Sequence, residues 1–116
     1  MKTLVMKFGG TSVGGAEAIA RSADIVAEAK KEWDQVAVVV SAMSGVTDLL
    51  LKGAHTAAAG DGETFKQIAK DLRAKHETAI NGLLEAANDR RQTSDAVLQY
   101  LTEFESLCHA VHILGE

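Results

Sequence analysis

Residues 7–15 near the start of the chain, Lys-Phe-Gly-Gly-Thr-Ser-Val-Gly-Gly, have the types and the spacing to bind phosphate. They follow a short apolar run and precede an alanine-rich stretch from about Ala16, an order that predicts strand, glycine turn and helix. Glycines let a backbone approach an anion closely, and a helix start presents free N–H groups and a positive dipole end. Lys7 adds a positive charge with three donors. The pattern fits a phosphate-binding turn, and as pattern alone it fits a plain strand-to-helix connection equally well.

Two common glycine motifs do not match this turn. The P-loop places lysine directly after its last glycine, whereas here Gly15 follows Gly14. The dinucleotide fingerprint G-x-G-x-x-G also fails, because the glycines stand in adjacent pairs. Since the lysine precedes the glycines, a different phosphate-binding design is required.

Hydrophobic patterning predicts the elements around this turn. A strand is expected over residues 3–8 and an amphipathic helix over 16–32. The run Val36-Ala37-Val38-Val39-Val40 is apolar on both faces, which is typical of a central parallel strand covered on both sides. Strand, helix and strand in this order form a right-handed βαβ unit by default.

The rest of the chain is expected to be helical. A helix should run from about Val46 to a break at 60–62, and another from about Glu63 to Ala87. A polar loop over 88–93 should then lead to a last helix capped by Thr93 or Ser94. Because two strands make a poor independent sheet, the inventory indicates an α/β fragment of a larger domain.

A second polar turn with glycine follows the second strand. It contains Ser41, Ser44 and Gly45, and the helix after it begins with Val46-Thr47-Asp48. In open α/β sheets, ligands bind beyond the carboxyl ends of the strands. If the two strands are neighbours, both turns should therefore face one crevice. Lysine, hydroxyls and backbone N–H groups suit phosphoryl transfer, which needs mainly positioning and charge stabilisation.

Composition narrows the function classes. Acidic residues outnumber basic ones, 16 to 12, and no basic stripe is present, which argues against nucleic-acid binding. The apolar runs fall far short of a membrane span. The single cysteine, Cys108, excludes an internal disulfide framework and fits a cytoplasmic location.

Two segments of the chain resemble the first two motifs of the aspartokinases, members of the amino acid kinase superfamily: residues 6–13, MKFGGTSV, and residues 39–48, VVSAMSGVTD. The helical stretch after them resembles an insertion that a subset of aspartokinases carries. The resemblance implies that residues 1–116 are a partial amino acid kinase domain, the N-terminal part of a carbamate kinase-like three-layer α/β/α fold. Residues 1–51 would form the βαβ unit with the phosphate and substrate loops, residues 52–112 the helical insertion, and no ACT regulatory domain would be present.

The resemblance also implies roles for individual residues. Lys7 would be catalytic, since it would contact the ATP phosphates and stabilise charge on the transferred group. The residues expected at the ATP phosphates are Lys7, Phe8, Gly9, Gly10 and Ser41. Those expected at the aspartate substrate are Thr11, Ser12 and Thr47. Mg²⁺ would accompany ATP and be held mostly by phosphates and water, so no protein ligand is assigned to it.

The activity that the resemblance implies is transfer of the ATP γ-phosphate to the β-carboxylate of L-aspartate, giving 4-phospho-L-aspartate for lysine, threonine and methionine synthesis. The family's nucleotide-binding second half has no counterpart in the sequence, so the 116-residue chain is expected to be inactive alone. Two alternatives stay open. The acceptor could be glutamate or N-acetylglutamate, or the chain could be a non-catalytic helical association module. An unpaired sheet edge and apolar helix faces also predict self-association.

One further cluster invites a metal interpretation. Glu105, His109 and His112 are spaced so that they can share one helix face, with Cys108 between them. No second cluster completes a site, and Cys108 falls on the apolar stripe of its helix. The sequence therefore predicts no metal site formed by protein ligands.

Overall fold

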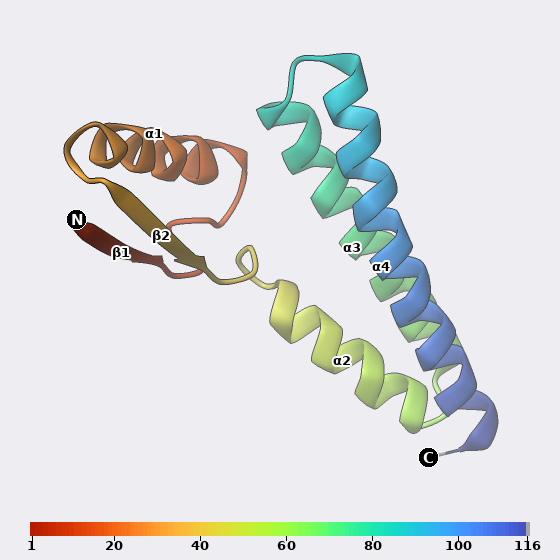
Figure 1. Cartoon of the computed structure of the whole chain (residues 1–116). Helices are drawn as coiled ribbons and strands as arrows, with labels where there is room; N and C mark the ends of the chain where they lie inside the picture. Colours follow the sequence, from red (N-terminus) through yellow and green to blue (C-terminus); the bar gives the residue numbers. More distant parts are fainter. Residues whose placement is uncertain (116) are drawn as a thin grey trace. The chain divides into compact units, whose positions relative to one another are not determined.

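The computed structural model describes residues 1–115, which form two compact units that divide between Gly45 and Val46 (Figure 1). The first unit contains β1 (Thr3–Phe8), α1 (Ala16–Glu32) and β2 (Gln35–Val40). The second contains α2 (Val46–Ala58), α3 (Gly62–Leu83) and α4 (Ala87–Leu114). The expected boundary between residues 51 and 52 falls inside α2, six residues after the point where the compact units divide.

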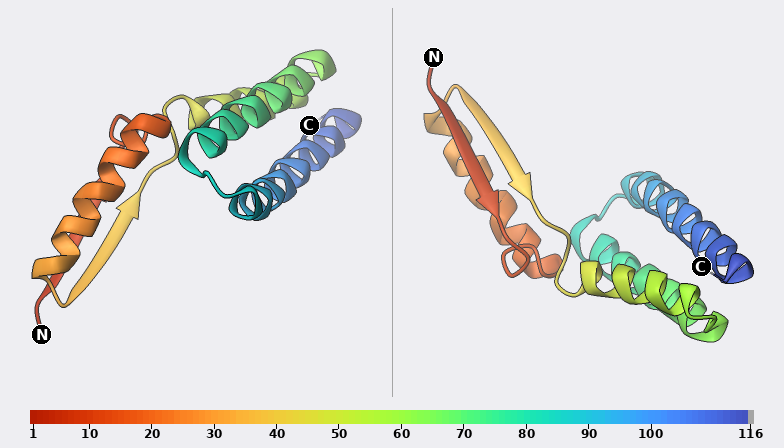
Figure 2. Two further views of the ribbon diagram at one scale, coloured as in Figure 1. Left: turned by 90° about the horizontal axis from the view of Figure 1, so that it is seen from above. Right: turned by 90° about the horizontal axis from the view of Figure 1, so that it is seen from below.

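The first unit is a βαβ unit with a two-stranded parallel sheet. Its register pairs Thr3 with Gln35 at one end and Phe8 with Val40 at the other. The second strand therefore begins one residue earlier than expected. Figure 2 shows α1 lying along the strands on one face of this sheet. Half-buried side chains alternate with exposed ones along β1, as the twofold period of a strand requires.

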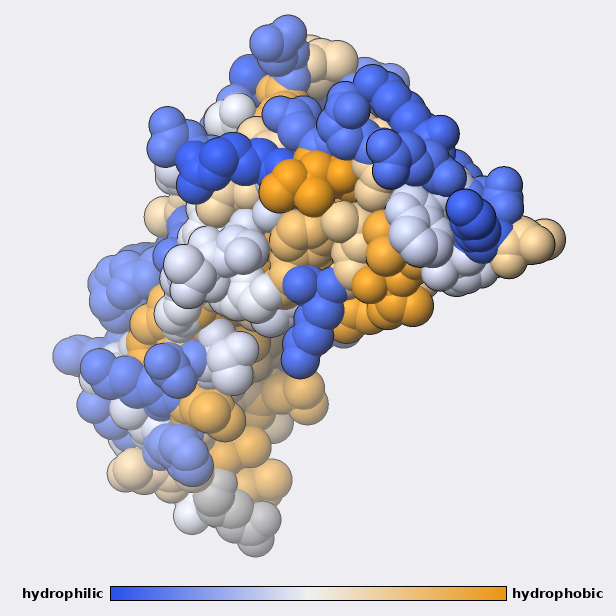
Figure 3. Space-filling model, turned by 90° about the vertical axis from the view of Figure 1, so that its left-hand side faces the viewer, coloured by the Kyte–Doolittle hydropathy of each residue, from blue (hydrophilic) through white to orange (hydrophobic). Residues whose placement is uncertain are grey.

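The alternation along β1 places Lys7 on the same face as Val5, the face of the sheet that α1 does not cover. Val5 is 66% exposed, and Val39, which pairs with Lys7, is 52% exposed. The expectation that β2 is covered on both sides is not met within residues 1–115. Figure 3 shows patches of apolar surface among hydrophilic side chains on one face of the molecule. An apolar sheet face of this kind is what a further layer of the fold would cover.

The second unit is built from three helices around one apolar core. Phe65 of α3 and Leu72 two turns further on are its largest fully buried side chains. Phe65 packs with Ala57 of α2 and Cys108 of α4. Burial raises the pKa of the Cys108 thiol. None of the helices described here has a stretch both long and apolar enough to cross a membrane.

A glycine-containing break between α2 and α3 lies where the sequence predicts one. Gly60 has a φ of +86°, a left-handed conformation that glycine adopts without strain. Asp61 then caps α3, because its carboxylate accepts a 3.1 Å hydrogen bond from the backbone N–H of Thr64. The Thr64 hydroxyl also donates to this carboxylate, and the two bonds hold the pKa of Asp61 below its usual value.

The connection between α3 and α4 differs from the expectation. The third helix ends at Leu83 rather than Ala87, and residues 88–93 belong to α4 rather than to a loop. The N-cap residue is Ala86, without a side-chain hydrogen bond, so neither Thr93 nor Ser94 is the cap. Arg90 accounts for the early turn, because its guanidinium donates to the carbonyls of Leu84 and Asn81 at the end of α3. Ser94 instead donates to Glu77 across the two helices.

Close packing of α2 depends on Gly53, which is buried in the middle of that helix. A Cβ atom at this position would lie 2.9 Å from Cζ of Phe104 and 3.3 Å from Cγ2 of Ile68. Both distances are shorter than ordinary van der Waals contact, so a side chain here requires the Phe104 ring or α2 itself to shift.

We expect Gly53→Val to lower the free energy of unfolding by about 2 kcal/mol, because overpacking forces the Phe104 ring out of place. The matched control is Ala54→Val at the exposed neighbouring position, which should cost only the helix propensity of valine, about 0.5 kcal/mol. Urea denaturation followed by far-ultraviolet circular dichroism measures both. Equal losses in the two variants would contradict this account of the packing.

Candidate functional site

The two glycine-bearing turns lie together at the carboxyl ends of β1 and β2, as the sequence predicts for neighbouring parallel strands. Two hydrogen bonds join them. The backbone N–H of Ser41 donates to the carbonyl of Phe8 at 3.2 Å, which extends the sheet by one bond. The Ser44 hydroxyl donates to the carbonyl of Gly10 at 3.0 Å. The second turn therefore holds the backbone of the first.

The first turn is also held from within and from α1. The backbone N–H groups of Ser12 and Val13 both donate to the carbonyl of Gly9, at 3.0 and 3.2 Å. Val13 is buried, and the buried Ser22 of α1 donates its hydroxyl to the carbonyl of Ser12 at 2.7 Å. These bonds use the carbonyl oxygens of Gly9 and Ser12 and the N–H groups of Ser12 and Val13. The earlier N–H groups of the turn and its side-chain hydroxyls remain as the groups that can donate to an anion.

Gly14 is required for space rather than for an unusual backbone angle. A Cβ atom there would lie 2.8 Å from Oγ of Ser44 and 3.3 Å from the carbonyl oxygen of Gly10, yet its φ is not positive. At Gly9 and Gly15 there is room for a side chain, because a Cβ atom there would meet nothing within 4 Å. The backbone is therefore tightly packed at Gly14 and open at Gly9, where a ligand can approach it.

The N-terminus of α1 adds a second feature that suits an anion. Gly15 is its N-cap residue, in extended conformation, and no side chain caps the helix. Its first N–H groups are therefore free to donate to a ligand, and the helix dipole favours negative charge at this end. Among residues 1–115 the one ion pair within 4 Å joins Lys31 and Glu28, so the exposed Lys7 is not paired with a carboxylate of this described part.

The structure brings together most of the residues that the sequence singles out. Phe8, Gly9, Gly10 and Ser41 belong to the bonded pair of turns, with Lys7 one residue before them on β1. Thr11 and Ser12 are exposed on the first turn. Thr47, by contrast, is an exposed residue in the first turn of α2 and belongs to the second unit. The functional roles of all these residues remain predictions.

Two serines that hold the site were not assigned a role from the sequence. The sequence shows Ser44 only as a member of the second turn. Its bond to Gly10 depends on the register of the strands, which brings the two turns together. For Ser22 the sequence does give an indication. A serine on the buried side of an amphipathic helix needs a hydrogen-bond partner. Which partner it finds depends on how α1 lies against the turn, and no local pattern encodes that.

The arrangement can bind phosphate groups and stabilise negative charge on them. It offers backbone N–H groups, the Lys7 ammonium group and the exposed hydroxyls of Thr11 and Ser12. The exposed Ser41 hydroxyl lies beside them and donates to the carbonyl of Ala42 at 2.9 Å, so it must rotate to donate to a ligand. Within residues 1–115 no group of three or more histidine, cysteine, aspartate or glutamate side chains could hold a metal ion. A magnesium ion that arrived with a nucleotide would fit this donor set only through phosphate oxygens and water.

We expect Gly14→Ala to displace the first turn, because its Cβ would collide with the Ser44 hydroxyl and the Gly10 carbonyl. The backbone amide resonances of Gly10 and Ser44 should shift strongly in ¹H–¹⁵N spectra, and stability of the first unit should fall by about 1–3 kcal/mol. Gly15→Ala is the matched control, since its Cβ meets open space. Spectra in which Gly14→Ala leaves the Ser44 and Gly10 resonances unmoved would refute the close approach described here.

Comparison with known proteins agrees with the geometry. The model of the amino acid kinase family matches residues 2–111. The aspartate kinase of Pseudomonas fluorescens is 37% identical over 91 residues, 78% of this chain and 22% of the relative. The chloroplastic bifunctional aspartokinase/homoserine dehydrogenase 1 of Zea mays is 32% identical over 111 residues, 96% of this chain and 12% of the relative. An aspartokinase of Bacillus sp. (strain MGA3) is 53% identical over 51 residues, 44% of this chain and 12% of the relative.

The chain therefore spans between about an eighth and about a fifth of the length of these relatives. The family match, in contrast, covers nearly the whole chain and includes the β1 turn, the β2 turn and the three-helix unit. The α/β architecture with a parallel sheet and a glycine turn agrees with it. The chain belongs to the amino acid kinase family.

Proposed function

We propose that this chain forms part of an enzyme that transfers the γ-phosphate of ATP to the β-carboxylate of L-aspartate, giving 4-phospho-L-aspartate. The observation that carries the proposal is the pair of turns joined by the Ser44–Gly10 hydrogen bond, beside Lys7, which forms no ion pair within residues 1–115. The names of the similar proteins support aspartate as the acceptor, since each is called an aspartokinase or aspartate kinase.

The ATP phosphates bind at the first turn in this proposal. The open backbone at Gly9 lets N–H groups close around phosphate oxygens, and the uncapped start of α1 faces the same negative charge. Phe8 and Gly10 fix this backbone through their bonds to the second turn, and Ser41 contributes a hydroxyl beside it. Mg²⁺ accompanies the nucleotide and is held by phosphates and water.

Lys7 is the catalytic residue of the proposed reaction. A β-carboxylate oxygen of aspartate attacks the γ-phosphorus in line, the bond from phosphorus to the bridging oxygen breaks, and ADP leaves with that oxygen. Negative charge on the transferred group is stabilised by the Lys7 ammonium group and the backbone N–H groups, which is where phosphoryl-transfer enzymes gain most of their rate. The hydroxyls of Thr11, Ser12 and Thr47 hold the aspartate.

The setting of the enzyme is part of the proposal. A cytoplasmic location suits a chain with a single, buried and unpaired cysteine. Self-association would bury exposed apolar side chains of the helices, such as Leu51 of α2 and Leu107 of α4. Sedimentation that returned only monomers at high concentration would count against self-association.

We expect Lys7→Ala to lower kcat for aspartate phosphorylation by about 100-fold to 1,000-fold, because it removes the side-chain charge at the developing phosphoryl group. Activity is measured in a chimera that joins this chain to the remaining part of the Pseudomonas fluorescens aspartate kinase. Lys2→Ala is the matched control, since Lys2 precedes the same strand and only its backbone makes hydrogen bonds within residues 1–115: its N–H donates to Asp34 and its carbonyl accepts from Gln35.

Two outcomes of that experiment would contradict the proposal. Full turnover in the Lys7→Ala chimera would remove the catalytic assignment of Lys7. Preference of the unmutated chimera for glutamate or N-acetylglutamate over aspartate would replace the proposed acceptor. Circular dichroism of each variant establishes that a loss of activity is not a loss of fold.

A further inference from the structure

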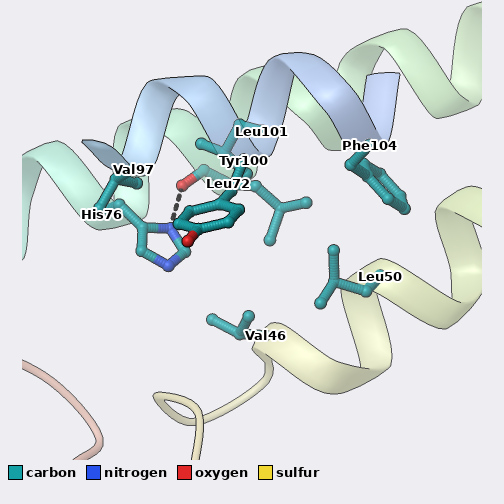
Figure 4. A pocket seen from close by; sticks show the side chains of 8 residues that line it. All are labelled: Val46, Leu50, Leu72, His76, Val97, Tyr100, Leu101 and Phe104. Atoms are coloured by element: carbon teal, nitrogen blue, oxygen red, sulfur yellow. Dashed lines mark hydrogen bonds between the residues drawn. The ribbon is translucent and has the colours of Figure 1, made fainter. Parts of the chain in front are cut away.

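A cavity of about 360 Å³ lies within the second unit, between α2 and the antiparallel pair α3 and α4 (Figure 4). Its walls are mainly aliphatic side chains, with Val46 and Leu50 from α2 and Val97 from α4 among them. Phe104 lies on one side of the hollow, and His76 and Tyr100 lie together on another. None of the residues that the proposed kinase reaction uses lines this cavity.

The size and lining of the cavity are those of a small-molecule site. Its volume corresponds to that of about twelve water molecules and falls within the range of known ligand pockets. Water in so apolar a hollow finds few hydrogen-bond partners, so its replacement by an apolar ligand is favourable. Tyr100 is 72% exposed, which leaves the hollow accessible from solvent at that side.

His76 gives the cavity a defined hydrogen-bonding group. Its Nδ1 lies 2.7 Å from the carbonyl oxygen of Leu72. A carbonyl oxygen only accepts hydrogen bonds, so Nδ1 must carry the proton, and in the neutral ring Nε2 is then an acceptor. Figure 4 shows the imidazole beside the Tyr100 ring with Nε2 directed toward the hollow. The cavity therefore combines apolar walls with two polar groups at one end, the Nε2 acceptor of His76 and the Tyr100 hydroxyl.

We propose that this cavity binds a neutral, flat aromatic molecule that carries one N–H or O–H donor, with the ring against Val97 and Phe104 and the donor on Nε2 of His76. No Asp, Glu, Lys or Arg lines the cavity, so a charged ligand would lose its hydration without gaining a partner. The proposal is independent of the proposed kinase function, because no residue that lines the cavity takes part in the proposed reaction.

The test titrates the 116-residue chain with indole and with indene, which has nearly the same shape but no N–H group. Chemical shifts of the backbone amides report where each compound binds. We expect saturable shifts at Val97 and Tyr100 with indole at a Kd of about 1 mM or below. Indene should bind the same residues about threefold to tenfold more weakly, since it cannot donate to His76.

Three variants separate the cavity from the rest of the surface. His76→Phe removes the acceptor, so indole should fall to the affinity of indene. Val97→Phe fills the cavity and should abolish binding of both compounds, and Leu50→Phe on the facing helix serves the same purpose if that variant does not fold. Leu107→Phe is the matched control, because Leu107 is 67% exposed on α4 and does not line the cavity.

Several results would overturn the proposal. Equal affinities of the unmutated chain for indole and indene would remove the role of His76. Binding that persisted when Val97→Phe filled the hollow, or that shifted amides of the first unit instead, would place the ligand elsewhere. Binding that weakened as the chain concentration rose would assign the cavity to a second copy of the chain.

Discussion

The close approach of two turns at the carboxyl end of a two-stranded parallel sheet is the constraint on which the candidate site depends. The Ser44–Gly10 hydrogen bond and the missing Cβ of Gly14 set that approach. With the turns held in this way, the first turn presents N–H groups and hydroxyls to a ligand rather than carbonyls. Lys7 lies just before this turn on β1. A side chain at Gly14 would press against the Ser44 hydroxyl and the Gly10 carbonyl and would therefore displace the turn that we propose binds phosphate.

The elements of the first unit could be predicted from sequence because their signals are local. β1 and α1 have the expected bounds, and β2 differs by one residue, since strand periodicity, glycine pairs and charges at the helix ends all point the same way. The glycine turn could be placed for the same reason. What sequence could not supply were the bonds of Ser44 and Ser22, because both partners lie far away along the chain and depend on how the strands and helix pack.

The second unit shows the same division between local and tertiary signals. The glycine break before α3 was predicted, whereas the start of α4 was not, because Arg90 and Ser94 satisfy distant groups instead of following their usual local roles. The cavity beside His76 had no sequence signal at all. It arises from space that Val46, Val97 and their neighbours leave unfilled, and only the packed helices reveal it.

The most direct test of the central claim is a titration of the 116-residue chain with MgATP, followed by ¹H–¹⁵N spectra. The account predicts saturable shifts confined to the amides of residues 9–12, Ser41 and the first turn of α1, which weaken as salt screens Lys7. A millimolar Kd for MgATP is enough to support the account, because only part of a nucleotide pocket is proposed here. Shifts that fell outside these residues, or that were insensitive to salt and to Gly14→Ala, would contradict a phosphate cradle at this turn.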